Sequence, residues 1–256
     1  MPGVPSTHRS VGLALASRAG AAPPVVDAAL ERAKQAAAEH AVAAVRPGER
    51  LALGTGSTAA HAVRALAARF PSGEFDCVAS SEATAELARS LGIPLRDLRA
   101  DDRFDRMIDG ADEVDEGLNL TKGGGGALLR EKLLAELSAQ VIILVDPTKL
   151  VRRLGARSPI PVEVVPFAGP LLERAFSQEG FRAQLRPGEN GRPFLTDNGN
   201  HLLDLRPAVP LEDPRRTASE IRDRTGVVEV GIFVGHASRV LVGFPDGRVD
   251  ERRPPV

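Results

Sequence analysis

Short apolar segments alternate with helical segments from Val25 to Asp146, and this alternation limits the folds that the chain can adopt. Residues 27–45 are rich in alanine, with charges at helical spacing, and predict a helix. The order apolar strand, glycine turn, helix then recurs, and a strand at 141–146 follows a predicted helix at 127–139. Strands that alternate with helices of this length form parallel βαβ units. The pattern therefore predicts an α/β domain with a doubly wound, mainly parallel sheet.

The second half of the chain has a different texture, because prolines become frequent after Lys149. Segments 170–180 and 213–226 predict helices, and segments 181–187, 194–205 and 227–234 predict strands. The tripeptide "NGN" at 198–200 lies between two apolar runs and predicts a hairpin turn. This order suggests a small α+β domain of split-βαβ type. Segment 237–244 predicts one more strand, which we expect to return to the first sheet.

Composition excludes several classes of protein. The 256 residues carry a net charge of −1 and no Trp or Tyr, so neither nucleic acid nor an anionic membrane is the expected partner. The single cysteine, Cys77, fits a reducing compartment, and we expect a cytoplasmic protein with this thiol buried in a strand. No apolar run approaches the length of a membrane span. Residues 1–24 are interpreted as a disordered extension; an import signal is the weaker alternative.

The turn "LGTGSTA", Leu53–Ala59, follows a strand and opens a helix. Glycines at such a turn let the backbone approach a ligand, and the free amides of the first helical turn favour an anion, with Ser57 and Thr58 as further donors. A dinucleotide site is the first alternative, but the acidic residue that it requires, Glu82, comes 28 residues after Gly54, later than expected. A tight turn with a serine cap and no ligand is the second. We expect a phosphate monoester.

Four consecutive glycines, 123–126, separate Lys122 from a leucine-rich helix. The lysine precedes the glycines, so this is not a Walker P-loop. Glycines cost conformational entropy, and ligand contact or tight turn geometry is their plausible reason. A flexible linker is the alternative, although a run joined directly to a strong helix makes a poor linker.

Asp109 and Asp112 follow the apolar strand end at Met107 and Ile108. The carboxyl ends of parallel strands border the crevice where such folds bind ligands, so we expect both carboxylates to face it. The nearby Glu113, Asp115 and Glu116 are interpreted as a solvated acidic loop. The oxygen ligands are not in EF-hand order, and the five histidines are not at metal-ligand spacing, which favours metal-free chemistry.

Glu131 lies one turn into the helix after the glycines, off its leucine arc and near small residues. A surface glutamate paired with a lysine is the alternative to a catalytic carboxylate. Lys149 follows the strand at 141–146 and can bring a cation to the same crevice, unless it is simply solvated.

The order of these motifs resembles the ribose-5-phosphate isomerase type A family. The motifs are "LGTGSTA", "SSEAT", "IDGADEVD…LNLTKGGGGALLREK", "VDPTKLV…LG", "PVEVVPFA", "TDNGN…LD" and "GVVEVGIFV". The resemblance runs from about Val25 to the C-terminus. It implies an enzyme that interconverts ribose 5-phosphate and ribulose 5-phosphate without a metal or other cofactor. It also implies a Rossmann-like domain (25–153 plus 232–256), a smaller ferredoxin-like domain (154–231), and a homodimer or homotetramer.

The resemblance also implies roles for particular residues. Glu131 would be the general base, Lys122 would stabilise the charge of an enediolate, and Asp109 with Asp112 would assist ring opening and hydroxyl proton transfer. Ser57 at the helix start, with Lys149, would hold the phosphate. The remaining substrate contacts would be Thr55, Gly56, Thr58, Gly110, Ala111, Gly123, Gly124 and Gly125.

Thr121 and Val230 depart from the family pattern, which has an apolar residue and often His or Asn at these positions. Two other functions stay open at this point. A non-catalytic sugar-phosphate sensor of the same fold would explain the glycine motifs but not Glu131 beside them. A nicotinamide-dependent oxidoreductase is disfavoured by the position of Glu82.

Overall fold

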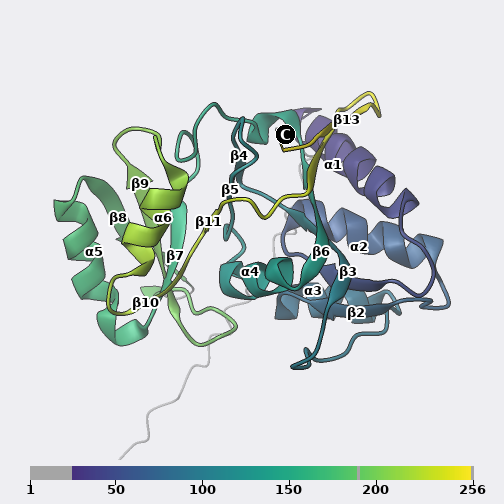
Figure 1. Cartoon of the computed structure of the whole chain (residues 1–256), viewed down its shortest axis with the longest axis horizontal. Helices are drawn as coiled ribbons and strands as arrows, with labels where there is room; N and C mark the ends of the chain where they lie inside the picture. The colour runs from purple at the N-terminus through teal and green to yellow at the C-terminus, as the bar shows by residue number, and fades with distance from the viewer. Residues whose placement is uncertain (1–24, 189–190, 255–256) are drawn as a thin grey trace, which may run out of the picture.

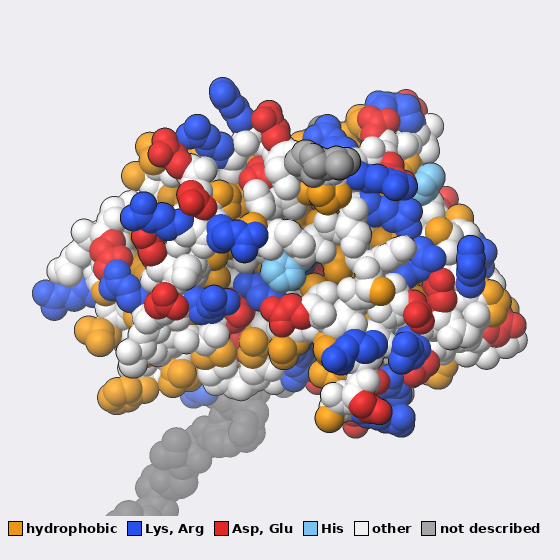
Figure 2. Space-filling model, viewed as in Figure 1, with side chains coloured by type: hydrophobic (Ala, Val, Ile, Leu, Met, Phe, Trp, Pro, Cys, Tyr) orange, Lys and Arg blue, Asp and Glu red, His pale blue; other side chains and the backbone are white. Residues whose placement is uncertain are grey.

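The computed structural model describes residues 25–188 and 191–254, and the predicted extension at 1–24 lies outside them. No helix within the described residues is long and apolar enough to cross a membrane. Figure 2 shows basic and acidic side chains interspersed over one face of the molecule, in keeping with the net charge of −1.

A six-stranded sheet forms the larger part of the molecule, in the order β13-β12-β6-β3-β1-β2 (Figure 1). Its strands are parallel except β13, which pairs antiparallel with β12. The predicted return of segment 237–244 to this sheet is confirmed, because β12 lies beside β6. The strands are β1 (Arg50–Leu53), β2 (Asp76–Ala79), β3 (Phe104–Gly110), β6 (Ser138–Val145), β12 (Arg239–Gly243) and β13 (Val249–Arg252).

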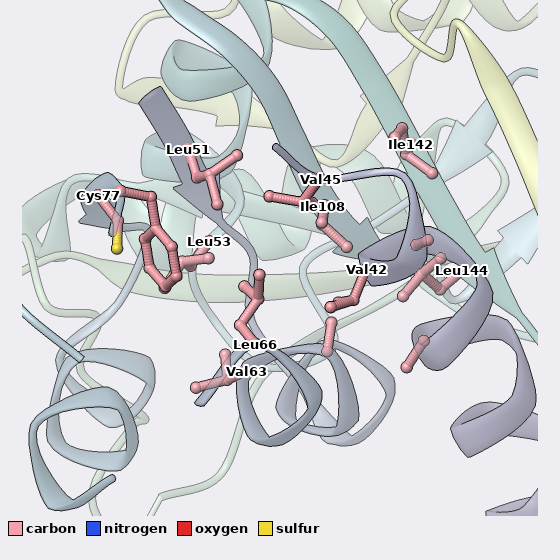
Figure 3. Close-up of a cluster of buried hydrophobic side chains, with 14 of the residues drawn as sticks. Val42, Val45, Leu51, Leu53, Val63, Leu66, Cys77, Ile108, Ile142 and Leu144 are labelled. Atoms are coloured by element: carbon pink, nitrogen blue, oxygen red, sulfur yellow. The ribbon is translucent and has the colours of Figure 1, made fainter. Parts of the chain in front are cut away.

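Helices cover both faces of this sheet, as a doubly wound fold requires. The alternation of side chains along a strand sends Leu51, Leu53 and Cys77 to the face covered by α1, α2 and α3 (Figure 3). Met107, Ile143 and Val242 point to the other face, toward α4. The helices are α1 (Val25–Ala43), α2 (Ser57–Arg69), α3 (Glu82–Ser90) and α4 (Leu128–Glu136). The predicted fold class is confirmed.

The predicted helix at 127–139 is too long at its end. Helix α4 ends at Glu136, and Ser138 already pairs with Phe104 in the sheet. The backbone N–H of Phe104 donates to the carbonyl of Leu137, so pairing with β3 takes over where helical bonding stops. Tertiary pairing decides this boundary, which helix propensity alone places too late.

A second, antiparallel sheet in the order β10-β7-β9-β8 packs against two helices. The predicted hairpin at "NGN" is confirmed, since Gly199 N–H donates to Thr196 O and Leu195 bridges His201. Strand β7 was not predicted, because its prolines obscured a fully buried segment. The elements are β7 (Ile160–Val164), η2 (Pro166–Ala168), α5 (Gly169–Gln178), β8 (Phe181–Leu185), β9 (His201–Pro207), α6 (Pro214–Arg222) and β10 (Val227–Val230).

A short three-stranded sheet, β11-β5-β4, lies between the two larger sheets in space (Figure 1). In sequence, β4 and β5 lie between β3 and β6, and β11 lies between β10 and β12. It corrects the interpretation of residues 113–116 as a solvated loop. Glu113 is buried, and its carboxylate accepts N–H bonds from Gly155, Arg157 and Ser158; Asp115 is buried as well, whereas Glu116 is exposed. The elements are β4 (Glu113–Val114), β5 (Leu120–Thr121) and β11 (Ile232–Phe233).

Gly231 separates β10 from β11, and the segment 227–234, predicted as one strand, is therefore two. A Cβ at this position would lie 2.2 Å from the carbonyl oxygen of Lys122 and 2.8 Å from that of Pro161. The domain boundary that we expect at 231/232 falls at this crossing. We retain the division into two domains as a proposal.

Candidate active site

One pocket opens at the carboxyl ends of β1 and β3. Strand β1 lies between β2 and β3. The chain continues from β1 to β2 on one side, whereas it continues from β3 toward β6 on the other side. The two connections therefore diverge at the carboxyl ends of β1 and β3 and leave a crevice there. The pocket also meets the glycine run and the 3-10 helix η1 (Pro147–Lys149). Its lining residues are Thr55, Gly56, Ser57, Thr58, Gly110, Ala111, Asp112, Lys122, Gly123, Gly124, Gly125, Glu131 and Lys149.

These lining residues are the site residues expected from the sequence, with one exception. Asp109 is fully buried and does not line the pocket. It lies behind Lys122, with its carboxylate Oδ2 2.8 Å from Lys122 Nζ. The fold thus brings together segments that are up to about a hundred residues apart in the sequence.

Lys122 is the centre of a buried charge cluster. Its Nζ lies 2.8 Å from Asp109 Oδ2 and 3.2 Å from Glu131 Oε1, and it donates to the carbonyl of Gly110 at 2.7 Å. Lys122 and Glu131 are each 3% exposed. Glu131 Oε2 has no hydrogen-bond partner among the described residues, so one carboxylate oxygen is left for a ligand.

Burial and mutual attraction act in opposite directions on the pKa values of this cluster. Burial raises the pKa of Glu131 to about 8, against the attraction of Lys122, and repulsion by Asp109 adds to the rise. Burial also raises the pKa of Asp109 against the same attraction. For Lys122, burial alone would lower the pKa, but Asp109 and Glu131 outweigh it and the net pKa is raised. These directions favour an ammonium on Lys122 and a Glu131 that keeps its proton to a higher pH than an ordinary glutamate does.

Gly54 is required for the position of Asp109. A Cβ at residue 54 would lie 2.0 Å from Asp109 Oδ1, and every other amino acid carries that atom. Asp109 Oδ1 uses this space to accept hydrogen bonds from the backbone N–H groups of Thr55, at 3.1 Å, and Gly110, at 2.7 Å. The glycine turn thus holds a buried carboxylate as well as opening a helix.

The start of helix α2 forms the other end of the pocket. Gly56 precedes the helix with a φ of 102°, and no side chain caps the first turn. Ser57 is exposed there, and Lys34 on α1 donates to Ser57 Oγ at 3.1 Å. The half-buried Lys149 reaches the pocket from η1. Lys34 does not itself line the pocket, and its Nζ is also paired with Glu31 Oε1 at 2.6 Å. Free helical amides beside ammonium groups favour an anion at this end of the pocket.

Lys34 was not predicted as a site residue. It lies in the middle of an alanine-rich helix that is distant in sequence from every glycine motif. Only the packing of α1 against α2 brings its ammonium to Ser57. No local sequence signal distinguishes it from a solvated lysine.

Some polar groups of the remaining lining residues already have hydrogen-bond partners within the protein. The hydroxyl of Thr55 is already hydrogen-bonded to Ser80 and Ser81, at 2.7 and 2.8 Å. Asp112 Oδ2 accepts from the backbone N–H of Gly124 at 2.8 Å. The carboxylate of Asp112 therefore both borders the pocket and fixes the glycine run.

Val230 and Thr121, the two departures from the family pattern, are buried beside the cluster and do not line the pocket. Lys132, the residue after Glu131, donates to the backbone carbonyls of Val230 and Ile232, at 2.6 and 3.1 Å. The contact uses the backbone of Val230, so it does not depend on which side chain stands there.

A larger cavity, of about 480 Å³, lies beside α3 and Arg130. None of the buried cluster Asp109, Lys122 and Glu131 lines it, so its size does not make it the candidate site. Cys77 is buried as predicted, and burial raises the pKa of its thiol to about 12. Within residues 25–188 and 191–254, no group of three or more His, Cys, Asp or Glu side chains has an arrangement that could hold a metal ion.

Comparison with known proteins gives a consistent result. Residues 76–247 match the family described as ribose 5-phosphate isomerase A (phosphoriboisomerase A). The chain is 47% identical over 220 residues to ribose-5-phosphate isomerase A of Chloroflexus aurantiacus, which covers 85% of this chain and 92% of the relative.

Two solved structures are also similar. Ribose 5-phosphate isomerase A of Methanocaldococcus jannaschii has a TM-score of 0.81 and 39% identity, over 87% of this chain and 99% of that one. A D-ribose-5-phosphate isomerase solved in complex with phospho-erythronic acid has a TM-score of 0.83 and 36% identity, over 88% and 99% of the two chains.

Proposed function

The chain belongs to the ribose 5-phosphate isomerase A family and is an aldose–ketose isomerase, and we propose that Glu131 is its general base in interconverting D-ribose 5-phosphate and D-ribulose 5-phosphate. The observation that carries this assignment is the position of Glu131. Its carboxylate is buried in the pocket, 3.2 Å from Lys122, with one oxygen free of protein hydrogen bonds among the described residues.

The reaction moves a carbonyl between adjacent carbons, and one carboxylate can transfer both carbon-bound protons. Glu131 removes the proton from C2 of the open-chain aldose, and the electron pair passes to the carbonyl oxygen on C1 to form an enediolate. A proton moves from the oxygen on C2 to the oxygen on C1. The protonated Glu131 then delivers its proton to C1, which leaves the ketose. A pKa of about 8 suits this double role, because a general base is most effective when its pKa lies near the operating pH.

The negative charge of the enediolate requires donors that are already in place. The Lys122 ammonium is fixed by Asp109, Glu131 and the carbonyl of Gly110, and such preorganised groups stabilise developing charge without reorganisation. Asp109 is covered by Lys122, so its proposed contribution is to hold that ammonium. Asp112 borders the pocket, and we assign to it the ring opening and the hydroxyl proton transfer.

The 5-phosphate is assigned to the start of helix α2. The backbone amides around Ser57 and Thr58 supply hydrogen-bond donors, and Lys34 and Lys149 supply positive charge. Thr55 and Gly56 also line the pocket, directly before the helix start. A phosphate held at a distance from the reacting carbons contributes to catalysis by positioning them.

The assignment of Glu131 is tested with Glu131→Gln in an aldose–ketose assay with ribose 5-phosphate. Loss of a general base lowers kcat by roughly 10² to 10⁴, with KM largely kept. Glu136→Gln is the matched control, because Glu136 lies on the same helix but is exposed outside the pocket. Near-normal turnover by Glu131→Gln would refute the role of Glu131 as the base.

The family match and the similar isomerases favour turnover over the non-catalytic sugar-phosphate sensor that the sequence left open. The aldose–ketose assay on the unmodified protein in the presence of EDTA tests the expectation of metal-free chemistry. Loss of turnover with EDTA would contradict that expectation.

We also propose a homodimer or homotetramer. Phe167 in η2 and Leu171 in α5 are 98% and 72% exposed, and Figure 2 shows apolar side chains at the lower left edge in this region. Large exposed apolar side chains that lie together favour a protein contact. Light scattering on the purified protein tests the oligomeric state.

A cytoplasmic location is likewise a proposal. It is supported by the single buried thiol of Cys77 and is tested by imaging a fluorescent fusion.

A further inference from the structure

Arg186 connects the small sheet to the glycine run of the pocket. It directly follows β8, on the left of Figure 1, whereas the glycine run leads into α4 at the centre. Its Nη1 donates to the backbone carbonyls of Gly123, at 3.1 Å, and Gly124, at 2.9 Å. Arg186 is not among the pocket-lining residues, and the mechanism proposed above gives it no role.

The guanidinium of Arg186 is itself held in one orientation. Nε and Nη2 donate to the two oxygens of Asp204 on β9, at 2.9 and 2.6 Å, and the Phe194 ring lies 5.8 Å away. Such a bidentate pair fixes the plane of the guanidinium and leaves Nη1 directed at the glycines. Asp204 is the second aspartate of the "TDNGN…LD" motif, and it does not line the pocket.

The orientation of these carbonyls determines where the neighbouring amides point. The peptides are trans, so each C=O and the N–H of the following residue point in opposite directions. With the carbonyls of Gly123 and Gly124 turned to Arg186, the N–H groups of Gly124 and Gly125 point to the pocket side. Gly124 N–H meets Asp112 there, at 2.8 Å.

The backbone N–H of Gly125 differs from its neighbours, because it has no hydrogen-bond acceptor among the described residues. Gly126 N–H donates back to Gly123 O at 3.0 Å. Gly125 lines the pocket and is exposed to it. A run of four glycines has wide conformational freedom, so this orientation needs support from outside the run.

We propose that Arg186 is a positioning residue that holds the 123–124 and 124–125 peptides so that Gly125 N–H donates to the enediolate oxygen. The cationic donor also polarises both peptides, which strengthens their N–H groups as donors. Asp204 fixes Arg186 for this purpose. The proposal rests on the isomerase function proposed above and extends it to a residue from the small sheet.

The test uses Arg186→Met, Arg186→Lys and Asp204→Asn, with Arg182→Met as control. Arg182 is an exposed arginine on β8, and it makes no contact with the glycine run in the described structure. We expect Arg186→Met to lower kcat by roughly 10²-fold, as for a misplaced reacting group, with KM changed little because the α2 phosphate site is untouched. The kcat values of Arg186→Lys and Asp204→Asn should lie between those of Arg186→Met and the unmodified protein.

A second readout separates positioning from a structural role. Phospho-erythronic acid carries a carboxylate where the enediolate charge develops, and its Ki should rise in parallel with the loss of kcat. The Ki of inorganic phosphate should stay the same, and melting temperatures identify variants that do not fold. If Arg186→Met does not fold, the lysine and asparagine variants decide the question by the same two inhibition constants.

Unchanged kcat and unchanged Ki for phospho-erythronic acid in the folded variants would overturn the positioning role, as would equal weakening of both inhibitors. Failure of the proposed function looks different, because the unmodified protein would then not turn over ribose 5-phosphate at all.

Discussion

At the scale of single residues, the site depends on one ammonium between two carboxylates. Lys122 contacts both Asp109 and Glu131, so the buried cluster has excess negative charge when both carboxylates are ionised. Burial already penalises each charge, and the excess raises the pKa of Glu131 toward neutrality. A glutamate on a solvated helix face would not have this property.

The pH dependence of the reaction should report this raised pKa. The base acts only when it is deprotonated, so kcat/KM should fall as the pH falls through about 8. The measurement is a pH profile of kcat/KM from pH 5 to 10. The phosphate of the substrate also titrates, with a pKa of about 6, and Glu136→Gln should share the profile of the unmodified protein. A profile that is flat down to pH 5 would contradict the raised pKa.

Gly54→Ala should inactivate the enzyme through Asp109. The added Cβ would lie 2.0 Å from Asp109 Oδ1, and the displaced carboxylate would no longer hold Lys122. A displacement of about 1 Å costs roughly 10²-fold in rate, and we expect at least this loss in kcat/KM. Gly48→Ala is the control, because that turn glycine has a positive φ but nothing within 4 Å of the new Cβ. Equal activity of the two variants would show that Asp109 tolerates displacement.

At the scale of elements, the pocket combines the ends of segments that belong to different layers. Strands β1 and β3 are neighbours in the sheet, so Gly54 and Asp109 meet at their carboxyl ends. Helix α1 packs on α2 and brings Lys34 to Ser57, and the end of β8 brings Arg186 to the glycine run. Each of these contacts exists because two elements that are distant in the sequence pack against each other.

Lys34→Met should weaken phosphate binding while leaving the chemistry intact. Hydrogen bonds to charged groups contribute about 1.5–3 kcal/mol, so we expect KM for ribose 5-phosphate to rise roughly tenfold or more with kcat nearly unchanged. Arg32→Met is the matched control, since Arg32 is an exposed cation on the same helix and, among the described residues, does not share the hydrogen bond of Lys34 to Ser57. Steady-state kinetics separate the two parameters. A fall in kcat without a change in KM would exclude Lys34 from the phosphate site.

At the scale of the whole molecule, the catalytic cluster opposes stability at high pH. The folded-state pKa of Glu131 is raised above the ordinary value of 4.5, so the folded protein binds this proton more tightly than the unfolded chain does. The resulting stabilisation is fully present below the unfolded pKa. It is lost as the pH rises from about 4.5 through about 8.

Glu131→Gln should therefore be more stable than the unmodified protein above pH 8. The substitution removes one carboxylate and leaves Lys122 balanced by Asp109. Thermal melts at pH 5 and pH 9 measure the effect, and each kcal/mol corresponds to roughly 2–4 °C in Tm for a chain of this size. The gain in Tm should be larger at pH 9 than at pH 5. A larger gain at pH 5 would show that Glu131 is not the group whose charge is penalised.

The sequence by itself determined the layered α/β architecture, the hairpin at "NGN" and the set of residues around the pocket. The architecture and the hairpin follow from short-range rules, because the apolar period predicts strands and helices and turn residues predict the hairpin. The set of pocket residues follows from the resemblance to the isomerase family. The sequence did not indicate β7 or the burial of Glu113, because prolines and clustered charge usually mean loop.

Only the tertiary structure decided the depth of Asp109 behind Lys122, the approach of Lys34 to Ser57 and the hold of Arg186 on the glycine carbonyls. Burial and ion pairing depend on which distant segments pack together, and a local pattern of residues does not contain that information.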